Sequence, residues 1–299
     1  MLTSGAASRA TRRRRIVPRA TLRYGPAVNA SPPLTSAAAP PPAPTAVRSR
    51  TERFDRLDAW RGVAIVWMAC FHFSFDLNMN GLLKPAQSFL SDPYWTTQRA
   101  CIVTLFLLGA GASQAVAVDA GQTWRRFWRR WAQVAGCAVL VSLATLPMFP
   151  HSWISFGVLH GIAVMLVVLR AIGTRLPPAR LARAPLAIAL LTLAAAGAWM
   201  LHDAVHSPFF DTRLTNWVGL TTRLPITEDY VPVFPWLGVM LAGYLVASLL
   251  LVHGRPFLAG GVPAVVRPLA VLGRWSLSFY MLHQPILIGS LLLFRMVFP

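Results

Sequence analysis

Charged residues are scarce in this chain, which has a single lysine, three cysteines and few acidic residues. Only 13% of the 299 residues are charged, about half the share found in a soluble domain, which argues against an ordinary cytosolic enzyme. Ten residues are acidic against 28 basic ones, and every basic residue except Lys84 is arginine. The three cysteines lie singly inside apolar stretches, so we expect neither a disulfide framework nor a redox centre.

Hydrophobic sequence is what the chain has in abundance. Hydrophobic side chains make up 55% of the residues, and the mean hydropathy is +0.52. Apolar runs near the length that a helix needs to cross a bilayer recur along the chain, without the alternation of a barrel strand. We therefore expect an all-α polytopic membrane protein with about seven transmembrane helices, over residues 58–78, 99–118, 131–149, 153–172, 185–202, 232–252 and 275–297.

Arginines alternate between the segments that join these runs. They gather in the N-terminal segment, in residues 125–130, in residues 170–183 and in residues 255–274, whereas the intervening segments hold few. Because basic residues stay on the cytoplasmic side, we expect a cytoplasmic N-terminus, a C-terminus outside and a multi-pass protein of a bacterial-type inner (plasma) membrane. Retention of basic residues on the cytoplasmic side also explains the net charge of +18. We therefore expect the lipid bilayer, and not nucleic acid, as the partner of these residues.

Composition divides the chain into two regions. Residues 1–52 are rich in proline, alanine and arginine and hold no long apolar run, which predicts a disordered basic tail. Residues 53–299 contain every expected span and form the expected transmembrane domain. We assign the chemistry to this second region.

Ionisable side chains fall in phase along the first expected span. Arg61 and His72 are eleven positions apart, which on a helix leaves them about 20° from the same direction and roughly 16 Å apart along the axis. Asp58 lies three positions before Arg61, and Asp76 lies four positions after His72. Ionisable groups inside a membrane are costly and mark functional sites, so this polar stripe is the first candidate site.

Three further residues form a candidate substrate-binding set. His160, between two glycines, lies in the fourth span and His283 in the last. A lone buried histidine is usually a core residue, and we favour that interpretation for His283. For His160, a core role and a functional role both stay open. Asp229 ends the long outer segment 203–231, which suits an acceptor-binding surface. We expect no metal, because no pair of ligands at one-turn spacing fixes the histidines.

These residues carry a family resemblance. The run Leu57-Asp58-Ala59-Trp60-Arg61-Gly62, followed by His72, resembles the first-span signature of the heparan-alpha-glucosaminide N-acetyltransferase catalytic-domain family. This family belongs to a wider transmembrane acyltransferase superfamily, and the chain resembles a short member of bacterial type. The resemblance covers about residues 54–297 and includes the stretches 156–162, 229–238 and 276–286.

The resemblance implies an integral membrane acetyltransferase. Such an enzyme moves an acetyl group from cytoplasmic acetyl-CoA to an extracytoplasmic acceptor, such as a sugar amine or hydroxyl of an envelope glycan. His72 matches the catalytic histidine, and Asp76 is its candidate partner. The cytoplasmic Arg126 and Arg129 have an Arg-x-x-Arg spacing found near CoA in related enzymes. The candidate acetyl-CoA contacts are therefore Asp58, Arg61, Arg126 and Arg129.

General chemistry leaves two mechanisms and two other protein classes open. His72 is suited to deprotonate an acceptor or to carry the acetyl group itself. A small proton-coupled transporter or permease would use the same intramembrane His72 and Asp76. A metal or haem membrane protein would use His72, His160 and His283 together.

Overall fold

The computed structural model describes residues 53–297, so the tail expected at residues 1–52 lies outside the described residues. Within the described range the chain is helical, without a β-strand. The long helices are α1 (Asp55–Met79), α2 (Pro93–Asp119), α3 (Trp124–Met148), α4 (Val158–Arg175), α6 (Pro185–Ala204), α7 (Val233–His253) and α9 (Ser276–Val297). Two short helices lie between them, α5 (Pro178–Leu181) and α8 (Arg267–Arg274).

All seven long helices are long and apolar enough to cross a membrane. They correspond one to one with the seven expected spans and confirm an all-α polytopic membrane protein. The second and third helices begin six and seven residues before their expected spans, whereas α4 begins five residues late, at Val158 and not at residue 153. The residues before it form an extended connection in which Phe156 makes a bridge with Tyr230. His160 therefore lies in the first turn of α4, at the end of this span.

The best-packed part of the molecule surrounds α7. This helix contacts α2, α4 and α6, and it has the largest buried share of the seven long helices. Met240 and Tyr244 of α7 belong to one buried cluster with Leu107 of α2 and Met165 of α4. The Tyr244 hydroxyl donates to the Leu176 carbonyl at 2.9 Å, so the buried phenol is paired.

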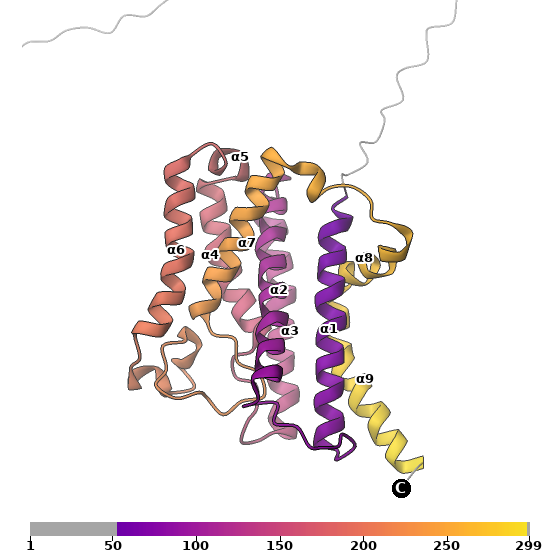
Figure 1. Ribbon diagram of the computed structural model, residues 1–299. Coiled ribbons are helices and arrows are strands. Elements are labelled where there is room, and N and C mark those ends of the chain that lie inside the picture. The colour runs from indigo at the N-terminus through magenta and orange to yellow at the C-terminus, as the bar shows by residue number, and fades with distance from the viewer. Residues whose placement is uncertain (1–52, 298–299) are drawn as a thin grey trace, which may run out of the picture. The chain divides into compact units, whose positions relative to one another are not determined.

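A second group of helices, α1, α8 and α9, lies beside α2 (Figure 1). Both α8 and α9 pack against α1, and α1 in turn packs against α2. Contacts advance in the same direction along α1 and α9, so the two helices are parallel: His72–His283, Asp76–Gln284 and Asn80–Arg295. The first and last of seven alternating spans are required to be parallel, which agrees with the helix count.

The order of the seven membrane helices predicts on which side of the membrane each loop lies. Reporter fusions that end after Arg130, in the basic first turns of α3, or after Arg183 are expected to report the cytoplasm, because two and four complete long helices precede these arginine-rich segments. Fusions that end after Lys84 or Leu214 are expected to report the other side. Paired alkaline phosphatase and fluorescent-protein reporters measure both outcomes. A cytoplasmic signal from a fusion after Val297 would contradict the seven-span topology.

Candidate active site

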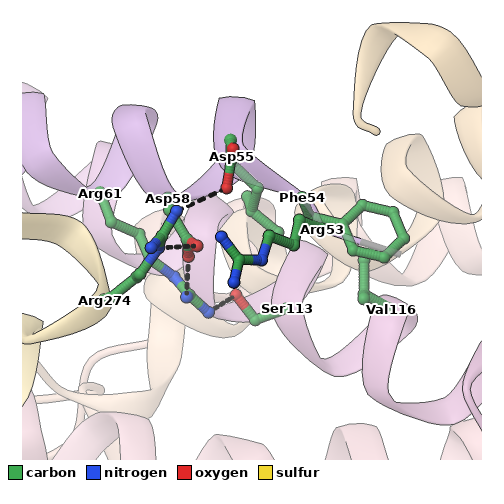
Figure 2. Close-up of a pocket in the computed structure, with 9 residues that line it drawn as sticks. Arg53, Phe54, Asp55, Asp58, Arg61, Ser113, Val116 and Arg274 are labelled. Atoms are coloured by element: carbon green, nitrogen blue, oxygen red, sulfur yellow. Dashed lines mark hydrogen bonds and ion pairs between the residues drawn. The ribbon is translucent and has the colours of Figure 1, made fainter. Parts of the chain in front are cut away.

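A cavity of about 410 Å³ lies at the N-terminal end of α1 (Figure 2). Its walls come from α1, α2, the last residue of α8 and the two residues that precede α1. Arg61 of the predicted polar stripe is part of the lining, so the structure places a cavity at the predicted donor end. The polar residues that line it are Arg53, Asp55, Asp58, Arg61, Ser113 and Arg274.

Alternating aspartates and arginines form a chain of ion pairs along this cavity. Arg61 contacts Asp58 at 3.0 Å. Arg274 contacts the other Asp58 oxygen at 3.4 Å and Asp55 at 2.7 Å. The second terminal nitrogen of Arg61 donates to the hydroxyl of Ser113, which donates to a backbone carbonyl of α2. Partners on two helices therefore set the direction of the Arg61 guanidinium.

Arg274 reaches α1 because glycines occupy the contact between α8 and α1. A Cβ atom on Gly273 would overlap the carbonyl oxygen of Asp58, and one on Gly62 would overlap that of Leu269. Small residues allow two helix backbones to approach closely in a membrane. Arg274 had no predicted role in the site. The sequence feature that marks Arg274 is the Gly273-Arg274 pair just before the last span. Gly273 lies against Gly62 only in the tertiary structure.

Positive charge exceeds negative charge around the cavity. Three arginines and two aspartates line it, which leaves a formal charge of +1. Figure 2 shows the Arg53 side chain extending toward Ser113, beside the ion pairs of Arg61. A low-dielectric recess with excess positive charge attracts an anion.

Three predicted site residues meet farther along the same helix. The ring centroids of His72 and His283 are 5.2 Å apart. The Gln284 amide nitrogen donates to both oxygens of Asp76, at 2.9 and 3.0 Å. Asp76 and His283 are both buried. The structure thus brings His72, Asp76 and His283 together and adds Gln284, to which the sequence analysis assigned no role.

Asp76 is turned toward α9 and not toward the histidine one turn before it. Both of its oxygens accept from Gln284, and His72 has no hydrogen-bond partner within residues 53–297. The spacing of four residues placed the two side chains on one face of α1, but the neighbouring helix supplies the actual partner of the carboxylate. Asp76 is therefore paired with Gln284, the neighbour of His283 on α9, and not with His72.

His160 and Asp229 lie together at the N-terminal end of α4. Asp229 accepts from the backbone N–H of Val158 at 2.7 Å. His160 accepts from the N–H of Gly157 at 3.3 Å, and its other ring nitrogen lies 3.2 Å from the Ser142 hydroxyl. The first N–H groups of a helix have no partner within the helix, and these two side chains supply it. Both residues therefore have a structural role at the start of α4.

The remaining predicted donor contacts lie away from the cavity. Arg126 and Arg129 are exposed in the first two turns of α3, and neither lines the cavity. Their contact with acetyl-CoA stays a prediction. Within residues 53–297, no group of three His, Cys, Asp or Glu side chains is arranged to hold a metal ion.

Comparison with known proteins decides the family. The sequence model of heparan-alpha-glucosaminide N-acetyltransferase, catalytic, matches residues 53–285, which include the cavity, His72 and His283. The chain belongs to the heparan-alpha-glucosaminide N-acetyltransferase catalytic-domain family. Searches of curated proteins and of solved structures find no significant match. Membership in this family, together with seven apolar helices, makes the chain a multi-pass membrane acetyltransferase.

Two substitutions of Asp229 separate its capping role from a substrate contact in this family member. Asp229→Ala leaves the Val158 N–H without its acceptor and is expected to lower the free energy of unfolding by about 0.5–2 kcal/mol. Asp229→Asn keeps an accepting oxygen and is expected to be better tolerated. Burial raises the pKa of Asp229, although the Val158 N–H and the charge of Arg99 oppose that shift, and asparagine removes the charge that burial disfavours while it keeps the acceptor. Thermal unfolding in detergent measures both, and equal destabilisation would contradict the cap.

Proposed function

We propose that the protein transfers an acetyl group from cytoplasmic acetyl-CoA to an amine or hydroxyl of an extracytoplasmic acceptor, a sugar of an envelope glycan. One observation carries the proposal: a single helix, α1, lines a cationic cavity at one end and bears the His72–His283 pair farther along. The family supports the acetyl chemistry. It also favours this function over a proton-coupled transporter built on the same His72 and Asp76.

The cavity is suited to the nucleotide end of the donor. CoA carries its phosphates there, and arginine presents a planar, permanently charged fork to phosphate oxygens. Asp58 and Ser113 hold Arg61 in one direction before any ligand binds, which lowers the entropy lost on binding. Arg126 and Arg129, exposed on the first turns of α3, add positive potential that attracts the polyanion.

The length of α1 suits the length of the donor. Eleven positions separate Arg61 from His72, a rise of roughly 16 Å, which is comparable to an extended pantetheine arm. Phosphates at Arg61 therefore bring the thioester carbonyl to the neighbourhood of His72. Because the arginine-rich loops mark the cytoplasmic side, the donor enters from the cytoplasm and the acceptor from the other face.

Two routes of acetyl transfer satisfy this arrangement. In the first, His72 removes a proton from the acceptor as its nitrogen or oxygen attacks the thioester carbonyl; the C–S bond breaks, and the departing CoA sulfur takes up the proton. In the second, His72 attacks the carbonyl, releases CoA and then passes the acetyl group to the acceptor. Either route requires an unobstructed ring nitrogen on His72, and His72 has no hydrogen-bond partner within residues 53–297.

The donor site is tested by substituting Arg61. Arg61→Ala is expected to weaken acetyl-CoA binding roughly ten- to hundredfold, because a hydrogen bond to a charged group contributes about 1.5–3 kcal/mol. Isothermal titration of purified protein in nanodiscs measures the affinity. Arg255→Ala is the matched control, since Arg255 also pairs with an aspartate, Asp119 at 3.2 Å, outside the cavity lining. Unchanged acetyl-CoA affinity in a folded Arg61→Ala variant would show that Arg61 does not contact the donor.

The transfer step is tested by substituting His72. His72→Ala is expected to keep acetyl-CoA binding and to lower the rate of acetyl transfer by about 10²–10⁴, the effect of removing a general base. The assay uses oriented vesicles with labelled acetyl-CoA on one side and acceptor on the other. His253→Ala is the matched control, because His253 is the exposed last residue of α7 and lies outside both the cavity lining and the outer segment 203–231. Transfer at the wild-type rate by His72→Ala would make His72 a packing residue.

A further inference from the structure

Two buried acceptor atoms on α9, where its side chains meet His72 and Asp76 of α1, have no donor. They are the Nε2 atom of His283 and the Oε1 atom of Gln284, and neither has a hydrogen-bond partner within residues 53–297. Buried polar atoms in native proteins are nearly always paired, and leaving one unpaired is destabilising. Two such atoms on consecutive residues of α9 indicate a place where another molecule supplies the donors.

The neighbours of His283 determine where its hydrogen lies. Its Nδ1 is 2.7 Å from the Tyr280 carbonyl oxygen, which only accepts, so Nδ1 carries the hydrogen. No carboxylate within residues 53–297 forms an ion pair with His283, and Phe279 stacks on the ring at 6.1 Å. An uncompensated imidazolium is unfavourable in such surroundings, so the ring is neutral. Nε2 is therefore a free lone pair, on the ring that lies 5.2 Å from His72.

Asp76 determines which way the Gln284 amide points. A carboxylate only accepts hydrogen bonds, so the amide nitrogen has to face its two oxygens, as observed at 2.9 and 3.0 Å. The amide oxygen is then directed away from Asp76 and cannot exchange places with the nitrogen. Asp76 is 7% exposed, which keeps water from competing for it. Asp76 is thus a positioning residue that keeps Gln284 Oε1 as an acceptor.

We propose that His283 and Gln284 form the acceptor subsite. Nε2 of His283 and Oε1 of Gln284 accept hydrogen bonds from two donor groups of one molecule, and this holds the reacting amine or hydroxyl beside His72. The class of acceptor that fits is a compact molecule with neighbouring donor groups, such as an amino sugar. This inference rests on the proposed acetyl transfer and deepens it by naming the residues that select the acceptor.

Substitution of His283 by asparagine separates its two ring nitrogens. Asparagine keeps a nitrogen donor near the place of Nδ1 for the Tyr280 carbonyl but has no atom in place of Nε2. With glucosamine as probe and detergent-solubilised protein, His283→Asn is expected to raise the acceptor KM roughly threefold to tenfold, the loss of one neutral hydrogen bond. The affinity for acetyl-CoA is expected to stay unchanged. His283→Gln, whose amide extends to the place of Nε2, is expected to restore part of the loss.

A control variant and a second probe distinguish selection from packing. Ser290→Ala is the matched control on the same helix, because the Ser290 hydroxyl donates only to the Ile286 carbonyl. Propylamine, which has one donor group, cannot engage both free acceptors. Wild-type protein is therefore expected to prefer glucosamine over propylamine by kcat/KM, and His283→Asn is expected to reduce that preference.

Each result supports or overturns the subsite. An unchanged glucosamine KM in folded His283→Asn overturns it and leaves acetyl transfer standing. An equal loss for both probes also overturns it, since that result indicates a water molecule or a packing role at the two acceptors. Wild-type protein that binds acetyl-CoA but acetylates neither probe overturns the subsite alone. Wild-type protein that binds no acetyl-CoA overturns the proposed function, and the subsite with it.

Discussion

The structure depends on one constraint: charges on a membrane helix must be paired by side chains of neighbouring helices. An unpaired charge in a low-dielectric interior costs several kcal/mol, and a paired one requires good geometry. The chain Asp55–Arg274–Asp58–Arg61 meets this requirement and ties α8 to α1. Its link through Ser113 ties α1 to α2. The same pairs line the cavity, so the contacts that stabilise this end of the bundle also make it attractive to anions.

The two ends of α1 differ in the kind of polar group they present. One end carries guanidinium groups that are permanently charged and suited to phosphate. The other end carries the rings of His72 and His283 and the Gln284 amide, which is paired with the Asp76 carboxylate. Nε2 of His283 and Oε1 of Gln284 have lone pairs that lack donors within residues 53–297. Under the proposed function, a charged donor molecule and a neutral or weakly basic acceptor meet different chemistry along one helix.

Helix termini account for the observed contacts of His160 and Asp229. Both were candidate substrate contacts, His160 from its place between two glycines in the fourth span and Asp229 from the long outer segment, and contact with substrate stays a prediction for both. The structure uses both to satisfy N–H groups at the start of α4. The start of that helix was hard to locate, since the apolar run continues from residue 153 through the extended connection that precedes Val158. Hydropathy shows how apolar a segment is, but the first residue of a helix also depends on side chains that can accept from its first N–H groups.

The sequence by itself determined the number and order of the membrane helices, because a span must be about 20 apolar residues whatever it packs against. It also determined that Asp58, Arg61, His72 and Asp76 share one face of α1, because helical periodicity is local. Only the tertiary structure decided the partners of that face. Arg274 of α8 reaches Asp58 where Gly273 lies against α1, and His283 and Gln284 of α9 reach His72 and Asp76. These partners lie about 200 residues away along the chain. Periodicity places a side chain on a face, but which helix covers that face depends on packing between segments distant in sequence.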